Sequence, residues 1–108
     1  MTVQARAEAL RLTPLCRPEP DREVEGGYIG DLLSWVMGNA QSGDAWITIM
    51  SNDNVVAVAV LTDVACVILS EGVTLDERLR DLAEKKGVNV FSTELSSFAA
   101  GAKVAALL

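Results

Sequence analysis

Three closely spaced glycines ahead of a predicted helix come nearest, by their spacing, to known chemistry. Gly26, Gly27 and Gly30 lie in the segment EGGYIGDLLSWVM, which resembles the start of a phosphate-binding loop. A Walker loop requires GxxxxGK followed by Ser or Thr, so that a lysine reaches the phosphates and a hydroxyl holds magnesium. This segment has no lysine, and Asp31 places a carboxylate where the phosphate would lie. Because the spacing also differs from the dinucleotide pattern GxGxxG, the segment favours a strand that bends tightly into a helix.

The composition restricts other catalytic chemistry. The chain has no histidine, which excludes Ser-His-Asp and Cys-His arrangements and removes the commonest metal ligand. Cys16 and Cys66 are far apart and form no CxxC pair, so we expect neither a zinc site nor a disulfide. Cys66 lies in an apolar strand and is expected to be a small buried hydrophobe. Cys16 lies beside Arg17, so the alternative for this residue is a reactive thiol with a lowered pKa. We therefore predict that the protein is not an enzyme and holds no metal and no cofactor.

The charge of the chain restricts its partners. A net charge of -6 and a pI near 4.5 would repel nucleic acid phosphates and anionic lipid surfaces, so we predict binding to neither. The first twelve residues carry charges that interrupt any signal-peptide core, and the apolar run 54–69 is broken by Thr62 and Asp63. We therefore expect one cytoplasmic domain over residues 1–108.

Hydrophobic periodicity predicts helices that alternate with short apolar strands. Residues 1–20 should form a helix capped by Thr2 and an edge strand at Leu12–Cys16, and residues 21–108 should form the core of the domain. The predicted core strands are 24–29, 45–50, 65–69 and 88–91, with helices at 31–40, 54–61, 74–86 and over the last residues. This alternation predicts an α/β fold: a single layered domain with a short, mostly parallel sheet flanked by helices.

Small polar residues fix where the predicted helices begin. The predicted caps are Asp31, the capping box of Thr74 with Glu77, and Ser92 or Thr93 for the last helix. Gly43 and Gly87 are expected in the left-handed conformation that ends a helix.

The segment NVVAVAVLTDVACVIL is ambiguous. We predict a helix over Asn54–Leu61 followed by a strand over Ala65–Leu69. The alternative is a hairpin, which would need a tight turn at residues 61–63 without the Asn-Gly or Asp-Gly signal. Helix propensity opposes our prediction, since each valine costs about half a kcal/mol in a helix. The sequence does not decide which of the residues 61–64 ends the helix.

Small polar residues also follow the predicted strands. Ligands of open parallel sheets gather beyond the carboxyl ends of the strands. The candidate ligand-binding residues are Gly27, Gly30, Asp31, Ser51, Asn52, Asp53, Ser70, Thr93 and Glu94. Their hydroxyls and amides suit a sugar or a base, while the absence of Lys and Arg among them disfavours phosphate. Ordinary helix capping is the alternative for these residues, and acid-base catalysis by Asp31, Asp53 or Glu94 is the least favoured.

Two aromatic residues are candidates for an interface. Trp46 is expected in the core, whereas Trp35 lies at the margin of its helix's apolar face and can be exposed. The final segment SSFAAGAKVAALL carries one charge, Lys103, so its helix is either buried or packed against a partner. We predict Trp35 and Phe98 as interface residues, with part of the last helix at a homodimer contact.

The order of motifs resembles the DRTGG domain family. The motifs are DREVEGGYIGDLLSWVMGNAQSGDAWITI, then NVVAVAVLTDVACVIL, then GVNVFSTELSSF, and they cover Asp21 to the C-terminus. Asp21, Arg22, Gly26 and Gly27 match the namesake residues of the family. Glu25 stands in place of the threonine, which argues against a function that needs a hydroxyl there.

The resemblance implies an α/β domain that forms dimers and acts as a regulatory or interaction module. It is closest to stand-alone members, which are often encoded beside iron-only hydrogenase genes, and it therefore implies a redox-enzyme partner. Similar domains accompany phosphotransacetylases and, together with CBS domains, pyrophosphatases that sense adenine nucleotides. Two functional hypotheses follow: a homodimeric interaction or regulatory module, and alternatively a sensor that binds an adenine nucleotide at the strand ends.

Overall fold

Five strands form one mixed sheet in the computed structural model, which describes all residues 1–108. The strands are β1 (Thr13–Cys16), β2 (Gly26–Ile29), β3 (Asp44–Thr48), β4 (Cys66–Leu69) and β5 (Val90–Ser92). Their order is β1-β5-β4-β3-β2, with β2 to β5 parallel and β1 antiparallel to β5. The predicted α/β fold with a mostly parallel sheet is confirmed, and Pro14 lies on an edge strand as expected.

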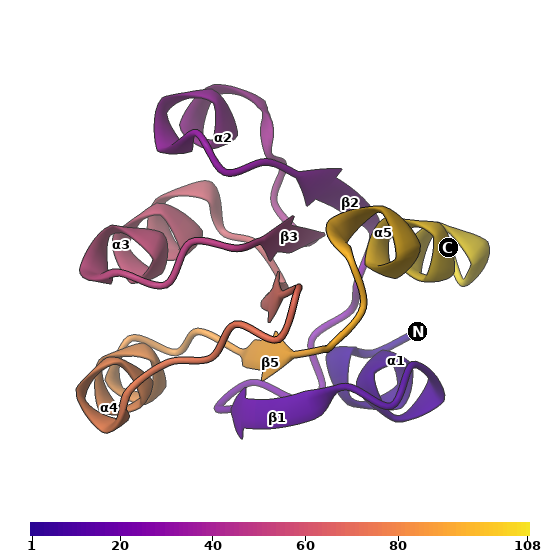
Figure 1. Ribbon diagram of the computed structural model, residues 1–108, viewed down its shortest axis with the longest axis horizontal. Helices are drawn as coiled ribbons and strands as arrows, with labels where there is room; N and C mark the ends of the chain where they lie inside the picture. The colour runs from indigo at the N-terminus through magenta and orange to yellow at the C-terminus, as the bar shows by residue number, and fades with distance from the viewer.

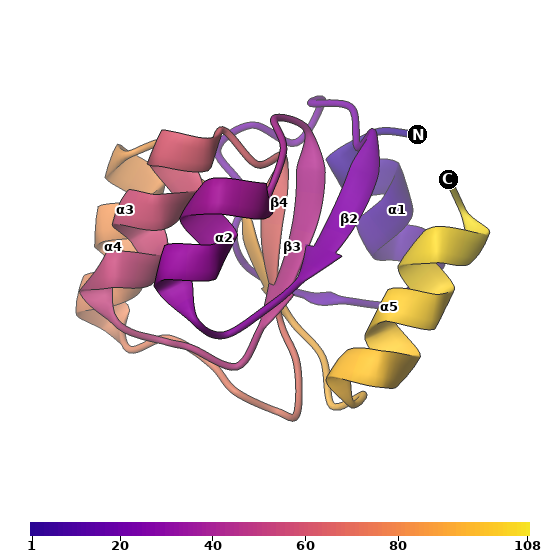
Figure 2. The same cartoon turned by 90° about the horizontal axis from the view of Figure 1, so that it is seen from above.

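Helices cover both faces of the sheet. The helices are α1 (Val3–Ala9), α2 (Leu33–Asn39), α3 (Asp53–Thr62), α4 (Glu77–Lys85) and α5 (Ser97–Ala106). Figure 1 shows α2, α3 and α4 on one face and α1 and α5 on the other. Figure 2 shows that α2 and α5 flank the edge strand β2 from opposite faces. No helix has the length and apolar character needed to cross a membrane.

The core lies on both sides of the two central strands. Every residue of β3 and β4 is buried, and Trp46 is fully buried as predicted. Trp46 belongs to the core cluster that includes Val36 of α2 and Leu79 of α4, and its indole Nε1 donates to the Gly30 carbonyl at 2.9 Å. Ile68 packs on the other side with the residues of α1 and α5. Apolar strands buried on both faces are what a parallel sheet requires.

The ambiguous valine-rich segment is a helix followed by a strand, as predicted. Helix α3 spans Asp53–Thr62 and ends at Asp63, which has a left-handed backbone with φ of 60°. Val55, Val56 and Val58 are buried against the sheet and the neighbouring helices. Burial of these side chains outweighs the low helix propensity of valine.

Asp31 does not cap α2, contrary to our prediction. The helix begins at Leu33, and the capping position belongs to Leu32, which makes no side-chain cap. The Asp31 carboxylate instead accepts hydrogen bonds from the Thr48 hydroxyl at 2.8 Å and from the Ile49 amide at 2.9 Å. Asp31 therefore ties the end of β2 to the end of β3.

Two other predicted caps are wrong because side chains nearer to the helix take their place. For α4 the cap is Asp76, which accepts from the Leu79 amide at 2.8 Å, in place of the predicted Thr74 capping box. For α5 the cap is Ser96, which accepts from the Ala99 amide at 3.1 Å, in place of Ser92 or Thr93. The Thr2 cap of α1 is confirmed.

Of the two glycines that we predicted to end a helix, Gly87 does so and Gly43 does not. Gly87 follows the end of α4 with φ of 76°, as predicted. Gly43 also has a positive φ, of 85°, but α2 already ends at Asn39 and continues into an extended Ala40. Gly43 therefore serves the turn before β3 and does not end the helix.

The side chain of Asn89, just before β5, forms hydrogen bonds that hold the long β1–β2 connection against the sheet. It is 1% exposed, and its amide donates to the carbonyl oxygens of Glu19 at 2.8 Å and Ala65 at 2.9 Å. Its Oδ1 accepts from the Glu19 amide at 2.9 Å. All three bonds involve backbone groups that would lose their partners if the side chain were removed.

We predict that Asn89→Ala lowers the free energy of unfolding by about 2–3 kcal/mol, because the buried Ala65 carbonyl is left unsatisfied and both hydrogen bonds to Glu19 are lost. Urea unfolding measures this change. Asn54→Ala is the control, because Asn54 is exposed and should stay within about 0.5 kcal/mol of the wild type. A loss for Asn89→Ala no larger than the control would contradict this role of Asn89.

Candidate functional site

The parallel strands bring the predicted ligand-binding residues to one edge of the sheet, apart from Gly27. Gly30 and Asp31 follow β2, Ser51, Asn52 and Asp53 follow β3, Ser70 follows β4, and Thr93 and Glu94 follow β5. Gly27 lies inside β2, away from the strand ends. We call the residues after the four strands the strand-end edge.

Several polar groups of the strand-end edge already bind one another. Ser70 is fully buried, and its hydroxyl lies 2.6 Å from that of Ser97 at the start of α5. Thr93 Oγ1 accepts from the Leu95 amide at 3.2 Å. The Glu94 carboxylate lies against Gly72, where an added Cβ would come 2.7 Å from Oε2. These contacts fix the loops after β4 and β5.

A basic side chain reaches this edge from α4, which the sequence analysis did not foresee. Arg78 donates to both carboxylate oxygens of Asp53, at 2.9 and 2.7 Å. The hydrogen bonds from Arg78 lower the pKa of Asp53 below its ordinary value. Its position in the first turn of α4 is the signal that could have found it, because helices that follow parallel strands begin at the same edge.

The strand-end edge contains little concave surface. Asp53 lines an open hollow between α3 and α4, and Gly27 lines a hollow beside α5. No hollow is lined by Gly30, Asp31, Ser51, Asn52, Ser70, Thr93 or Glu94. The structure thus gathers these candidates in space without forming a pocket from them.

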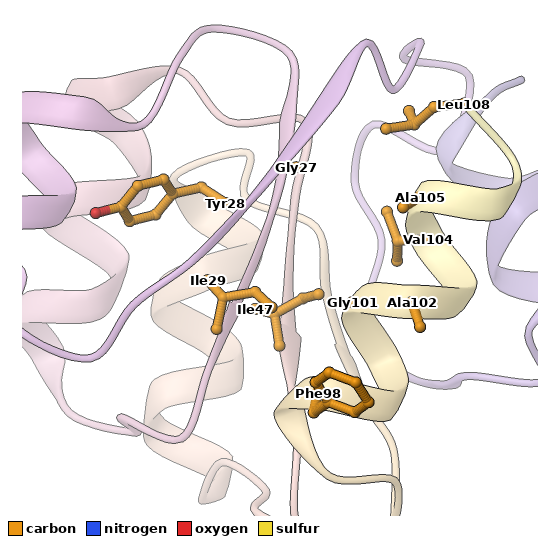
Figure 3. A pocket seen from close by; sticks show the side chains of 10 residues that line it. All are labelled: Gly27, Tyr28, Ile29, Ile47, Phe98, Gly101, Ala102, Val104, Ala105 and Leu108. Carbon is orange, nitrogen blue, oxygen red and sulfur yellow. The ribbon is translucent and has the colours of Figure 1, made fainter.

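The hollow beside α5 is apolar and lies between the helix and the edge strand β2 (Figure 3). Its volume is about 320 Å³, and its lining includes Gly27, Ile29, Ile47, Phe98, Gly101 and Ala105. In Figure 3 the Ile29 and Ile47 side chains lie on the side of α5, whereas Tyr28 points to the other side of the sheet. Phe98 is 85% exposed at one end of this hollow. We call this surface the β2–α5 face.

Small residues shape the β2–α5 face, and acidic residues are missing from it. A Cβ added to Gly101 would come 2.5 Å from Ile29 Cδ1, so glycine permits this close approach of α5 to β2. No acidic residue follows Glu94 in the sequence, and Lys103 is the one charged residue of α5. An exposed apolar surface of this kind is typical of an interaction site.

The two predicted interface residues lie on opposite faces of the sheet. Phe98 is on α5, and Trp35, which is 64% exposed, is on α2. Leu33 and Met37 line a hollow beside α3, and Trp35 is about 200° around the helix from each of them. Trp35 therefore lies on the side of α2 that faces away from α3.

Neither cysteine is a reactive group. Both thiols are free and buried. Burial raises the pKa of Cys16 to about 11 and that of Cys66 to about 12, so both stay protonated near neutral pH. The predicted burial of Cys66 is confirmed, and the alternative of a lowered pKa at Cys16 is wrong. No group of three potential metal ligands occurs in the structure.

Comparison of the sequence with protein families identifies the family of the chain. The model of the DRTGG domain matches residues 19–107. The chain belongs to the DRTGG domain family. No curated protein sequence matches this DRTGG domain.

A solved structure shares the fold of this DRTGG domain. It contains the CBS and DRTGG domains of the regulatory region of Clostridium perfringens pyrophosphatase, complexed with its activator, diadenosine tetraphosphate. The TM-score is 0.71 at 18% sequence identity, over 92% of this chain and 44% of that one. The chain thus spans less than half of that structure, which also contains CBS domains.

The namesake residues of the DRTGG domain lie at the opposite end of the sheet from the strand-end edge. Arg22 forms a salt bridge with Asp63 at 2.9 Å, and its guanidinium also donates to the Asp63 carbonyl, at the end of α3. Gly26 pairs with Asp44, and an added Cβ there would come 2.7 Å from the Asp44 carboxylate. In this DRTGG domain both residues therefore hold the entry to β2 against the start of β3 and the end of α3.

We predict that Asp31→Ala lowers the free energy of unfolding of the DRTGG domain by about 1–2 kcal/mol, because Thr48 and the Ile49 amide lose an acceptor. Asp31→Asn, which retains a side-chain oxygen, should lose less than about 1 kcal/mol. Thermal or urea unfolding of the two variants measures the difference. Equal losses in both variants would indicate that the charge of Asp31, and not its hydrogen bonds, matters.

Proposed function

We propose that this chain is a non-catalytic regulatory domain that works as a homodimer through its β2–α5 face. The observation that carries the proposal is Phe98, which is 85% exposed beside an apolar hollow on a face without acidic residues. In a chain of net charge -6, most surfaces repel a second copy. The β2–α5 face is one on which two copies can meet without that repulsion.

The β2–α5 face is suited to contact its own copy. A projecting aromatic ring and a hollow lined by small residues occur on the same surface, along the same helix. In a symmetric dimer each surface meets itself, so the Phe98 ring of each copy can lie over Gly101 and Ala105 of the other. Aromatic side chains that fill such hollows contribute much of the binding energy of interfaces.

Regulation without catalysis is supported by the chemistry of the chain. The thiols are buried, the hydroxyls of Ser70 and Thr93 are engaged within the protein, and the Asp53 carboxylate is bound by Arg78. The related DRTGG domain belongs to the regulatory region of an enzyme. A redox-enzyme system as the regulated partner stays a prediction from the family resemblance.

We predict that Phe98→Ser raises the dissociation constant of the dimer at least about thirtyfold, because a buried aromatic contact is lost. Sedimentation equilibrium at micromolar concentration measures the shift from dimer to monomer. Leu61→Ser is the matched control, because Leu61 is also exposed but lies on α3, on the other face of the sheet. A wild-type chain that is monomeric, or a dimer dissociated by Leu61→Ser alone, would contradict the proposal.

Adenine nucleotide sensing is a second candidate function. The observation that favours it is the related regulatory region, which was crystallised with diadenosine tetraphosphate. In this chain Arg78 supplies the positive charge that the strand-end residues lack, in the first turn of α4. A nucleotide at this edge would have to displace or share the Asp53 carboxylate from that guanidinium.

For this second function we predict a rise in the unfolding midpoint with AMP, ADP, ATP or diadenosine polyphosphates. A ligand at about 100 times its dissociation constant adds about 2.7 kcal/mol, which raises the midpoint by about 10 °C or more in a domain of this size. Arg78→Gln should abolish the shift, and Lys85→Gln, at the far end of α4, should preserve it. An unchanged midpoint across the nucleotide panel would reject the sensor and leave the homodimeric module.

A further inference from the structure

A small polar hollow lies between α1 and the edge strand β1, and its volume is about 280 Å³. Helix α1, the connection to β1 and the residues of and after β1 provide most of its lining. Phe91 of β5, which is buried in the core cluster of α1 and α5, also lines it. We call this site the α1–β1 hollow, and its main residues are Gln4, Ala7, Glu8, Arg11, Arg17 and Phe91.

The α1–β1 hollow lies almost entirely outside the part of the chain that matches the family. Every residue of its lining except Phe91 precedes residue 19, at which the match with the DRTGG domain begins. The lining shares no residue with the hollow of the β2–α5 face and none with the strand-end edge. Neither the family nor the two functions proposed above therefore account for this hollow.

The hollow lies in a basic region of an acidic chain. The side chains of residues 1–17 carry a net charge of +2, and those of residues 18–108 carry -8, which together give the net charge of -6. The basic residues of the first segment are Arg6, Arg11 and Arg17, and its acidic residue is Glu8. An anion is repelled by most of this chain, so the surface around the hollow is where its approach is most favourable.

Two guanidinium groups line the hollow, and neither is neutralised by a carboxylate. Arg11 and Arg17 are exposed, and neither forms a salt bridge. The Nη1 of Arg17 donates to Gln4 Oε1 at 3.0 Å, which holds this guanidinium beside α1. Since a guanidinium has several N–H donors, most donors of Arg17 stay free for a ligand.

The acidic residue of the hollow is bound to an amide and not to an arginine. Glu8 Oε1 accepts from Gln4 Nε2 at 2.9 Å, and Gln4 Oε1 in turn accepts from Arg17. The lining therefore holds two positive charges and one negative charge. An anionic ligand would gain from both guanidinium groups and would be opposed by Glu8.

Buried Arg6 adds a third positive charge on α1. It is 2% exposed, its Nη1 donates to the Val104 carbonyl at 3.2 Å, and its Nε has no hydrogen-bond partner. Arg6 forms no salt bridge, and it precedes Ala7, which lines the hollow. Because charges inside a protein are screened less than those in water, Arg6 makes the surroundings of α1 more favourable for an anion.

We propose that the α1–β1 hollow binds a small organic phosphate, with Arg11 and Arg17 as donors to the phosphate group. Guanidinium groups bind phosphate oxygens in pairs, and a phosphomonoester with about two negative charges matches two arginines. The volume is close to the lower limit of about 300 Å³ for small-molecule pockets. Leu12, Pro14 and Phe91 provide apolar surface for the organic group.

The test is an NMR titration of the isotope-labelled full chain with phenyl phosphate, inorganic phosphate and benzoate at constant ionic strength. We expect phenyl phosphate to shift the amide signals of Ala7, Arg11, Leu12 and Arg17, with a dissociation constant of about 1 mM. Inorganic phosphate should bind at least about threefold more weakly because it lacks the organic group. Benzoate should bind at least about threefold more weakly because it has fewer acceptor oxygens and one charge.

Two arginine variants locate the phosphate group. Arg11→Gln and Arg17→Gln should each weaken phenyl phosphate binding at least about fivefold, because a charged donor is lost. Lys85→Gln is the matched control: it removes one positive charge from α4, on the other face of the sheet, and should change the affinity less than about 1.5-fold. All three residues are exposed, so the variants should keep the wild-type unfolding midpoint.

A variant that strengthens binding makes the test independent of folding defects. Glu8→Gln removes the negative charge of the hollow and keeps an oxygen for Gln4, so it should tighten phenyl phosphate binding about two- to threefold. Glu77→Gln, which removes an exposed carboxylate from α4, should have no such effect. Arg78→Gln should also leave the affinity unchanged, which separates this site from the strand-end edge.

Four results would overturn the inference. The first is the absence of amide shifts with phenyl phosphate up to about 20 mM, well above the expected dissociation constant. The second is an equal loss of affinity in Lys85→Gln and Arg11→Gln, which would indicate unspecific attraction of anions. The third is binding of inorganic phosphate as tight as that of phenyl phosphate, which would exclude a site for the organic group. The fourth is binding of benzoate as tight as that of phenyl phosphate, which would assign the hollow to carboxylates.

Discussion

The winding of the chain through four consecutive parallel strands is the constraint on which the rest of the structure depends. Each crossover between neighbouring parallel strands is right-handed, so the three helices between β2 and β5 all lie on one face of the sheet. The other face has to be covered by the ends of the chain, namely α1 and α5. Helix α5 packs along β2 and β3 with Ala100 and Val104 buried, while the exposed part of the helix carries one charge, Lys103.

The fold could be predicted from the sequence because its strongest signals are local. Apolar strands such as 45–50, the short loops between elements, and Gly87 after a clear amphipathic helix each specify their element from neighbouring residues. The helix state of residues 54–61 followed from the missing turn signal at residues 61–63, despite the valines. The caps were less predictable, because several nearby oxygens compete for each helix start. The Asp31 carboxylate accepts hydrogen bonds from Thr48 of β3 and from the Ile49 amide just after it, and the Thr93 hydroxyl accepts one from the Leu95 amide.

The candidate site was predictable in part, since the strand-end rule follows from parallel topology alone. That rule correctly places Asp31, Asp53, Ser70 and Glu94 at one edge of the sheet. It does not indicate whether the edge is concave, nor that Arg78 binds Asp53 across 25 residues of sequence. Both properties depend on how α4 packs beside α3. The hollows beside α3 and α5 depend in the same way on contacts between distant segments, and the sequence offers for them only the low charge of the two helices, which carry one charged residue each.

The β2–α5 face and the helices α2, α3 and α4 lie on opposite faces of the sheet, so any coupling between them has to pass through the sheet or around its edge. Strand β2 provides a direct path, because successive side chains of a strand point to opposite faces. Ile29 borders the hollow beside α5, while Tyr28 packs on the other side, in the cluster that includes Leu33 of α2. Gly30 touches the Tyr28 ring closely enough that an added Cβ would come 2.8 Å from it, which fixes the position of the ring. A dimer that shifts β2 would therefore move Tyr28 against α2.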